Sequence, residues 1–237
     1  MEQDITAILP VFNEERRILF TLKQLEQFNN GRPNPVRFTV VDDGSTDKTF
    51  LIIKDFADSR PWINCMKLPD NKGKGAAIKE GVNKADGKFV FFMDADLPVP
   101  LLTITEAIPI LESGVDIVLG SRTHPQSRIL NQTPLRKVIS RIGNILIRVS
   151  TGLPFRDTQC GFKGFTRAAS KELFSTLKTD GYMFDVEILL AASKAGFRIR
   201  EIPVEWSNVP DGSFNPLTDS IKMLIELYRI VSKTKQV

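Results

Sequence analysis

Short apolar runs alternate with longer amphipathic segments through the first half of the chain. Strands are predicted where the apolar runs are continuous, at residues 4–11, 36–43, 63–68, 88–94 and 115–121. Helices are predicted where apolar residues recur at helical spacing, at 14–28, 46–57, 74–85 and 100–113. This regular alternation predicts an α/β fold with a Rossmann-like, mainly parallel sheet that is flanked by helices.

The second half of the chain contains more predicted helix than strand. Strands are predicted at 161–166 and 198–206, and helices at 134–152, 167–176, 184–195 and 217–233. The sequence contains no internal repeat and no low-complexity tract. A length of 237 residues suits one large domain or two small ones.

Two of the helices in this half carry a continuous apolar stripe. In the helix 134–152 the stripe consists of Leu135, Val138, Ile139, Ile142, Ile145, Leu146 and Val149, with Arg136, Lys137, Arg141 and Arg148 beside it. Such a basic amphipathic helix either lies in a membrane interface or packs its stripe on the sheet. The stripe of the last helix is Ile221, Leu224, Ile225, Tyr228 and Val231, and here a core or dimer contact is favoured.

Composition narrows the choice of partners and compartment. The net charge of +4 suits an anionic partner, such as a nucleotide, a phospholipid surface or a nucleic acid. Cys65 and Cys160 form neither a disulfide framework nor a metal-binding spacing, which favours a reducing compartment. The start of the chain has no basic region typical of a secretory signal. No segment approaches the roughly 20 apolar residues of a membrane span, so any membrane contact would be peripheral or through an anchor outside this chain.

Acidic residues gather where the predicted strands end. The motifs are 9-LPVFNEE-15, 42-DDGSTD-47, 94-DADL-97 and 120-GSR-122, each following a strand. Ligands of open parallel sheets bind beyond the carboxyl ends of the strands. Four carboxylates there, from Asp42, Asp43, Asp94 and Asp96, would repel one another unless a cation lay between them. A divalent metal with oxygen ligands fits this need.

Each motif also has a purely structural reading. The segment 13-NEE-15 alone suits a helix start, and 42-DDGSTD-47 alone suits a turn with Ser45 or Thr46 as N-cap. The segment 94-DADL-97 alone suits an acidic exit from a strand. Their joint occurrence after successive strands favours the metal. If the chain is extended there, Asp94 and Asp96 point the same way and reach one ion, or one reaches the ion and the other a sugar hydroxyl.

With 73-GKGAA-77 added, these motifs resemble those of the inverting family 2 glycosyltransferases with the GT-A fold. The resemblance runs from about residue 4 to 206. The branch it resembles most makes polyprenyl-phosphate sugars, and 157-DTQCGFKGFTR-167 is most similar to dolichyl-phosphate β-glucosyltransferases. The resemblance implies one catalytic domain over 1–237, with a nucleotide-sugar-binding half at 1–122 and an acceptor-binding half at 123–237.

The resemblance also implies roles for individual residues. The donor-binding set is Pro10, Phe12, Glu14, Asp42, Asp43, Lys74, Asp94, Ala95 and Asp96. Within it, Asp94 and Asp96 would hold Mg²⁺ or Mn²⁺ against the donor pyrophosphate. Arg122, Arg136 and Ser140 would bind the acceptor phosphate, and Asp96, Arg122 and Asp157 would act in catalysis. Mannosyl relatives often carry a metal-ligating Gln after the DADL motif, where this chain has Pro98.

Asp157 has three possible roles at this point: it orients the acceptor, acts as a base, or pairs with one of the arginines. A general base is not required, because a lipid monophosphate with a second pKa of about 6 is largely dianionic at neutral pH and is already a nucleophile. The implied reaction moves a hexose, glucose from UDP-glucose, to a polyprenyl or dolichyl phosphate at the cytoplasmic face of a membrane.

Four other functions are alternatives to this one. The first is a transferase that uses GDP-mannose or another nucleotide sugar, with a different lipid or a soluble sugar as acceptor. The second is a nucleotide-sugar-binding protein without transfer activity. The third, a nucleic-acid binder, is disfavoured because the arginines do not alternate with exposed aromatics. A P-loop nucleotidase is disfavoured because 71-NKGKGAA-77 lacks the required pattern. The sequence does not determine the oligomeric state.

Overall fold

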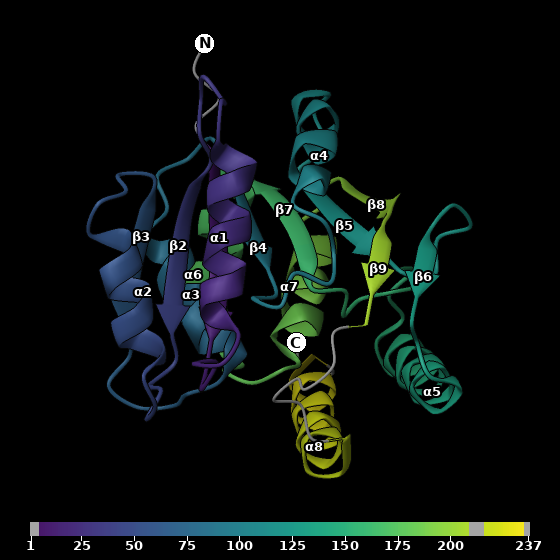
Figure 1. Ribbon diagram of the computed structural model, residues 1–237. Coiled ribbons are helices and arrows are strands. Elements are labelled where there is room, and N and C mark those ends of the chain that lie inside the picture. Colours follow the sequence, from purple (N-terminus) through teal and green to yellow (C-terminus); the bar gives the residue numbers. More distant parts are fainter. Residues whose placement is uncertain (1–4, 209–215, 235–237) are drawn as a thin grey trace.

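A seven-stranded sheet forms the centre of the molecule (Figure 1). The computed structural model of the protein describes residues 5–208 and 216–234, without the side chains of 134–136, 216–218 and 233–234. The strands are β1 Ile5–Val11, β2 Arg37–Asp42, β3 Ile63–Lys67, β4 Phe89–Met93, β5 Ile117–Ser121, β7 Phe162–Thr166 and β8 Ile199–Pro203. Their order is β3-β2-β1-β4-β7-β5-β8, and only β7 runs antiparallel to its neighbours. The predicted α/β fold with a mainly parallel sheet is confirmed.

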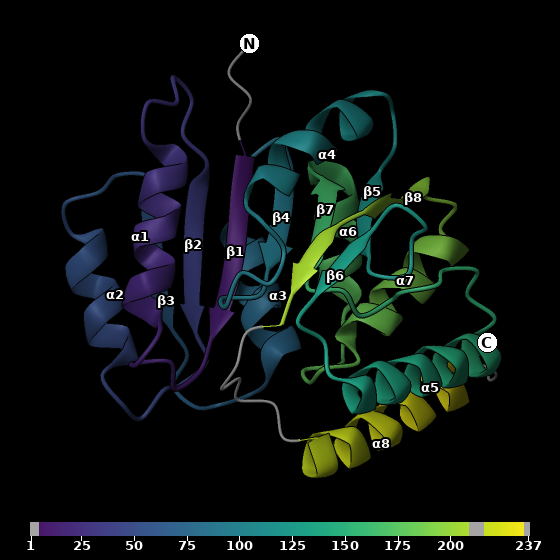
Figure 2. The same ribbon diagram turned by 45° about the vertical axis from the view of Figure 1, so that its right-hand side comes forward.

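Helices cover both faces of the sheet. On one face lie α1 Ile18–Asn29, α2 Thr49–Ala57 and α4 Leu102–Glu112, and on the other lie α3 Lys74–Lys84, α6 Arg167–Thr176 and α7 Phe184–Lys194. Two further helices, α5 Pro134–Thr151 and α8 Pro216–Thr234, lie side by side at one end of the molecule (Figure 2). That end is the one toward which the parallel strands β1, β2 and β4 point (Figure 2).

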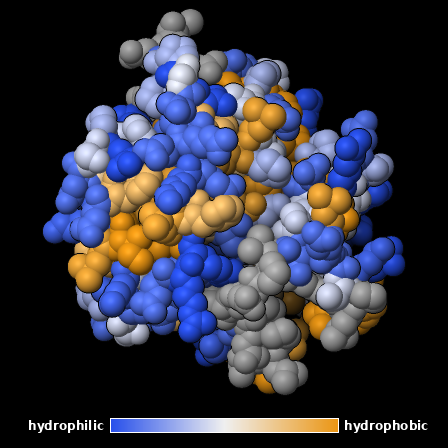
Figure 3. Space-filling view, in the orientation of Figure 1, coloured by the Kyte–Doolittle hydropathy of each residue, from blue (hydrophilic) through white to orange (hydrophobic). Residues whose placement is uncertain are grey.

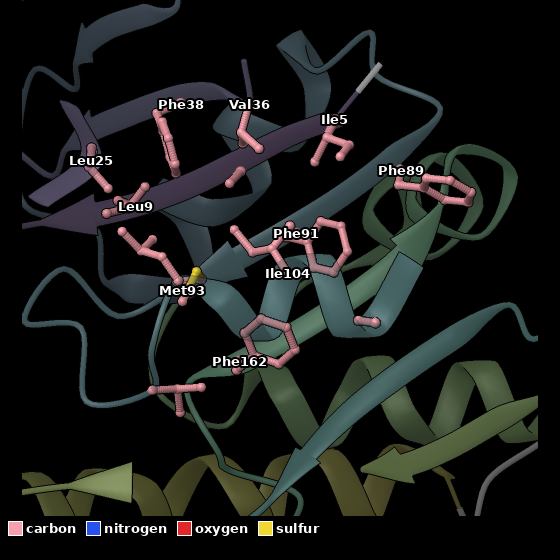
Figure 4. Packing of buried hydrophobic residues seen from close by; sticks show 14 of the residues in the cluster. Ile5, Leu9, Leu25, Val36, Phe38, Phe89, Phe91, Met93, Ile104 and Phe162 are labelled. Carbon is pink, nitrogen blue, oxygen red and sulfur yellow. The ribbon is translucent and has the colours of Figure 1, made fainter. Parts of the chain in front are cut away.

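Alternation of side chains along the strands divides the core into two apolar clusters, one under each helical layer. In β4 every residue is buried, because Phe89, Phe91 and Met93 face one cluster and Val90 and Phe92 face the other. Figure 4 shows the first cluster, in which Phe91 contacts Phe162 of β7 with ring centroids 5.8 Å apart. Burial on both faces explains why this strand reads as a continuous apolar run.

One predicted strand is divided in the structure. The segment 198–206 forms β8 and then, after Val204, a separate short strand β9 Glu205–Ser207. Strand β9 pairs in parallel with β6 Arg128–Leu130, which the apolar pattern did not predict. This two-stranded sheet holds the buried Trp206 near the end of β5.

Two helices of the first half begin later than predicted. The segment from Glu14 to Arg17 forms a turn, in which the backbone carbonyl of Glu14 accepts from the N–H groups of Arg17 and Ile18. Helix α2 begins at Thr49, where the Asp47 carboxylate accepts from the Thr49 N–H. Neither Ser45 nor Thr46 is the N-cap.

The apolar stripes of α5 and α8 are largely exposed, so the core reading is wrong for them, except at Val231 of α8, which packs against the second apolar cluster. More than a third of the surface of each side chain is exposed for Val138, Ile139, Ile142, Ile145, Leu146 and Val149 of α5 and for Ile221, Leu224, Ile225 and Tyr228 of α8. Packing of these helices depends instead on Ile147, Leu227 and Ile230. Leu135 of the predicted stripe lies outside the described side chains.

The close approach of β7 to β4 gives a test of the packing. An added methyl at Gly164 would overlap the Phe91 ring, so Gly164→Ala is expected to lower the free energy of unfolding by about 1–3 kcal/mol. Urea denaturation measures this change. Gly143→Ala is the control, because a methyl there meets no atom within 4 Å and alanine favours the helix. An equal loss in both variants would contradict the packing argument.

Candidate active site

A cleft of about 1760 Å³ opens at the carboxyl ends of β1 and β4 and continues between α5 and α8. Of the predicted site residues, it is lined by Pro10, Phe12, Glu14, Asp43, Lys74, Asp94, Ala95, Asp96, Arg122 and Ser140. Asp42 and Asp157 do not line it. Arg136 belongs to α5, and its side chain lies outside the described residues. Residues from both halves of the chain therefore meet in one cleft.

The loops after β1 and β2 hold each other in place. The Asn13 N–H donates to Ser45 Oγ at 2.8 Å, and the Thr46 N–H donates to Asn13 Oδ1 at 3.0 Å. Asn13 takes up a left-handed conformation with φ of 52°, which asparagine tolerates better than most residues. The Glu14 N–H donates to Thr49 Oγ1 at 2.7 Å, and Arg17 pairs with the Glu14 carboxylate through two nitrogens.

The two aspartates that follow β2 have different surroundings. Asp43 lines the cleft, and its two carboxylate oxygens accept from the N–H groups of Lys72 and Gly73 at 2.9 and 2.7 Å. Burial raises its pKa above the usual value. Asp42 has no exposed surface, and it accepts from the Ser45 N–H at 2.9 Å. Asp42 thus stabilises the loop in this structure, and its contact with the donor stays a prediction.

Asp94 and Asp96 follow β4 and both line the cleft. The segment is not extended as the sequence argument assumed, because the Leu97 N–H donates back to the Asp94 carbonyl in a tight turn. Lys74 Nζ lies 2.5 Å from Asp94 Oδ1. Burial alone would raise the pKa of Asp94, but Lys74 holds it below the usual value. Burial and the neighbouring Asp94 raise the pKa of Asp96 to about 6.

Arg122 and Asp157 form a bidentate ion pair at the cleft. Arg122 Nε and Nη2 donate to the two carboxylate oxygens of Asp157 at 2.7 and 2.8 Å, and the Arg122 backbone N–H donates to the same carboxylate at 2.8 Å. Asp157 has no exposed surface, whereas the Arg122 side chain is 20% exposed and faces the cleft.

This geometry decides between the three roles considered for Asp157. Burial alone would raise the pKa of Asp157, but Arg122 holds it below the usual range. A carboxylate that is buried behind an arginine and ionised is neither a proton acceptor for the cleft nor a contact for the acceptor. Asp157 therefore orients Arg122, which confirms the role of pairing with an arginine, and its part in catalysis stays a prediction.

Sequence reasoning missed Gly161 and Asp185, which line the cleft, and Lys163, which does not. Lys163, in the middle of β7, is fully buried and lies 2.7 Å from Asp185 at the start of α7. Lys163 Nζ also donates to the Cys160 carbonyl at 2.9 Å. Gly161 has no space for a Cβ atom because the Asp94 carboxylate occupies it. A lysine within the apolar run 161-GFKGF-165 was the available signal, because a buried lysine needs an acidic partner.

The carboxylates of the cleft suit a divalent cation that is shared with a phosphate. Among the described residues, no three His, Cys, Asp or Glu side chains are grouped as metal ligands. Asp94 and Asp96 supply two hard oxygen ligands on one rim. Mg²⁺ is commonly held by one or two carboxylates and substrate phosphates, with waters completing the shell, so the residues fit such an ion.

Comparison with known proteins identifies the family. A family model described as "Glycosyl transferase family 2" matches residues 6–174. This chain belongs to that family. A dolichyl-phosphate beta-glucosyltransferase of Trichomonas vaginalis is 34% identical to it, over 95% of this chain and 70% of the relative. The dolichyl-phosphate beta-glucosyltransferase of Saccharomyces cerevisiae is 31% identical, over 94% of this chain and 72% of the relative.

Solved structures of other glycosyl-transferring enzymes have a similar fold. Glucosyl-3-phosphoglycerate synthase of Mycobacterium tuberculosis, crystallised with UDP, has a TM-score of 0.71 and 20% identity, over 97% of this chain and 80% of that chain. Another crystal structure of the synthase contains Mn²⁺, UDP-glucose and phosphoglyceric acid, and its TM-score is 0.68 at 19% identity, with the same coverage. The expected GT-A fold and family resemblance are confirmed.

The buried pair gives a prediction for stability and its pH dependence. Asp157→Asn removes the partner of Arg122 and is expected to lower the free energy of unfolding by about 2–3 kcal/mol at pH 7. The loss is smaller than for a fully buried pair because Arg122 is partly exposed. The folded pKa of Asp157 is lowered, so the pair's stability is present above the unfolded pKa of about 3.9 and is lost as the pH falls through the folded value.

Urea denaturation at pH 7 and at pH values below about 4 measures this dependence. The difference in free energy of unfolding between wild type and Asp157→Asn should be smaller at the acidic pH values than at pH 7. Asp86→Asn is the matched control, since Asp86 pairs with Arg37 on the surface with 63% exposure, and a small effect is expected there. Equal losses for the two variants would contradict the assignment.

Proposed function

We propose that the protein transfers glucose, with inversion, from UDP-glucose to dolichyl phosphate or a similar polyprenyl phosphate at a membrane surface. The observation that carries the proposal is the likeness to dolichyl-phosphate beta-glucosyltransferases along nearly the whole chain. The cleft adds support, because it runs from the carboxylates of Asp94 and Asp96 to helices α5 and α8, whose apolar side chains are exposed. Mg²⁺ or Mn²⁺ is the proposed cofactor.

The donor is proposed to lie along the loops after β1, β2 and β4. Pro10, Phe12 and Glu14 flank the site on one side, and Asp43 and Lys74 flank it on the other. Asp94 and Asp96 would hold the divalent cation against the diphosphate. When bound, that cation neutralises the negative charge that grows on the leaving nucleoside diphosphate. This assignment makes 1–122 the donor half, although β7 of the second half lies between β4 and β5.

The acceptor phosphate is proposed to meet Arg122 and Ser140, which line the same cleft, together with Arg136. Asp157 fixes the Arg122 guanidinium, so its positive charge is oriented before the acceptor arrives. A phosphate monoester with a second pKa of about 6 is largely dianionic at neutral pH. Its oxygen can attack the anomeric carbon on the side opposite the diphosphate, which inverts the configuration, and no proton has to be removed.

The surface formed by α5 and α8 suits the interface of an anionic bilayer. Helix α5 contains four basic residues and no acidic residue. The acidic side chains of α8 turn inward, because Asp219 is buried and the Glu226 carboxylate accepts from the Met183 N–H at 2.9 Å. The outer surface therefore combines apolar and basic side chains. Within the described residues, neither helix is apolar enough over its length to cross a bilayer.

A transfer assay tests the reaction. The protein, radiolabelled UDP-glucose, dolichyl phosphate and Mn²⁺ are expected to give a lipid-linked glucose, and EDTA should abolish it. Asp96→Asn should lower the rate at least about 100-fold, because the charge of the leaving diphosphate is then poorly neutralised. GDP-mannose serves as the competing donor and a soluble sugar phosphate as the competing acceptor.

The outcomes of this assay are distinct. No lipid-linked product with any donor would overturn the proposal. Transfer only to the soluble acceptor would support the alternative acceptor class. UDP binding without turnover would indicate a binding protein. Full activity of Asp96→Asn, at an unchanged melting temperature, would show that the metal assignment is wrong.

Liposome flotation tests the membrane surface. The wild-type protein is expected to float with vesicles that contain anionic lipid, and high salt should weaken this binding. Val149→Glu places a charge on a side chain that is 80% exposed on α5 and should reduce flotation. Phe20→Glu is the control, since Phe20 is 70% exposed on α1. Figure 3 shows an apolar patch over α1 and α2. Equal loss in both variants would contradict the role of α5.

A further inference from the structure

Lys74 forms an ion pair with Asp94 inside the cleft. It is the first residue of α3, and its ammonium group lies 2.5 Å from Asp94 Oδ1. The two side chains keep 19% and 29% of their surface exposed, and both line the cleft. The pair is therefore accessible to a ligand, in contrast to Lys163 and Asp185, whose side chains are 1% and 4% exposed.

The Asp94 carboxylate has few other positions available. It fills the space where a Cβ atom of Gly161 would be, and the Asp94 N–H donates to the Gly161 carbonyl at 3.1 Å. Backbone thus lies on one side of the carboxylate and Lys74 on the other. A cation that bound to Asp94 would have to approach along the side that Lys74 occupies.

Lys74 itself has other anionic groups near it. Asp185 lies close enough to stabilise its charge, and Phe184 presents a ring whose centroid is 6.0 Å from the ammonium group. Asp185 stays fixed because Lys163 pairs with it. The donor diphosphate would add two further negative groups on the same rim. Lys74 can therefore leave Asp94 without losing all of its electrostatic partners.

We propose that Lys74 is an exchangeable counterion that holds Asp94 in the absence of the donor and gives it up to the divalent cation when the donor binds. The inference rests on the proposed function for the identity of the cation and the diphosphate. Two cations on one carboxylate repel each other strongly in a partly buried site. The metal alone must displace Lys74, whereas the metal with a diphosphate gives Lys74 a new partner.

This exchange makes metal and nucleotide binding interdependent. The wild-type protein should bind Mn²⁺ weakly by itself and more tightly in the presence of UDP. By linkage, Mn²⁺ must then strengthen UDP binding by the same factor. Lys74 thus acts as a positioning residue that prevents the site from filling with free metal before the donor arrives.

Calorimetry with Mn²⁺ alone, and with Mn²⁺ after saturation with UDP, tests the exchange. Lys74→Met leaves Asp94 and Asp96 without this counterion, so its affinity for Mn²⁺ alone should rise at least about tenfold. UDP should increase the affinity of Lys74→Met for Mn²⁺ by a smaller factor than it does for wild type. Without metal, Lys74→Met should melt at a lower temperature than the wild type, and Mn²⁺ should raise its melting temperature more.

Two variants serve as matched controls. Lys74→Arg keeps the charge and should keep the weak binding of Mn²⁺ alone. Lys84→Met removes a positive charge from an exposed position in the last turn of the same helix, outside the cleft lining, and should leave the affinity for Mn²⁺ near that of wild type. Unchanged or weaker Mn²⁺ binding in Lys74→Met would overturn the exchange, as would equal gains in Lys74→Met and Lys84→Met.

The result also separates this inference from the proposed reaction. If no glucose is transferred to a lipid but the variants bind Mn²⁺ as expected, the proposed lipid acceptor is wrong and the proposed exchange of Lys74 for the cation is retained. No binding of Mn²⁺ by any variant, with or without UDP, would overturn the exchange and the metal assignment together.

Discussion

The structure depends on how a partly buried row of carboxylates is kept in the folded state. Burying an unpaired carboxylate costs several kcal/mol or more, yet Asp94, Asp157 and Asp185 all lie at one end of the sheet. Each has a basic partner within 3 Å, supplied by Lys74, Arg122 and Lys163 respectively. These pairs stabilise the three carboxylates in the folded protein without a metal. Asp94 still lines the cleft, where a metal could bind to it.

The same requirement explains the segment 157-DTQCGFK-163. Its first residue fixes Arg122, its Gly161 leaves room for the Asp94 carboxylate, and its Lys163 pairs with Asp185. Three residues of one short segment therefore position the charged side chains Arg122, Asp94 and Asp185 of the same site. These contacts constrain the residue types at Asp157, Gly161 and Lys163.

Most strands and helices, in their order along the chain, could be predicted from periodicity, and the family and the position of the cleft from the motifs. The distinction between Asp42 and Asp43 could not, because adjacent side chains point to opposite sides and the motif alone does not say which side is the cleft. Asp157 and Arg122 are 35 residues apart, so their pairing depends on tertiary structure. The stripes on α5 and α8 were evident, but helical spacing does not say whether a stripe meets the sheet or the surroundings.

The position of β7 has a consequence for how the chain folds. Strands β4 and β5 are close in sequence but do not pair with each other, because β7 separates them and pairs with both. During synthesis on the ribosome, the edge of β4 that pairs with β7 therefore stays unpaired until more than 60 further residues have been made. Such long-range pairing slows folding and leaves an apolar strand edge open for association with other chains until β7 closes the sheet.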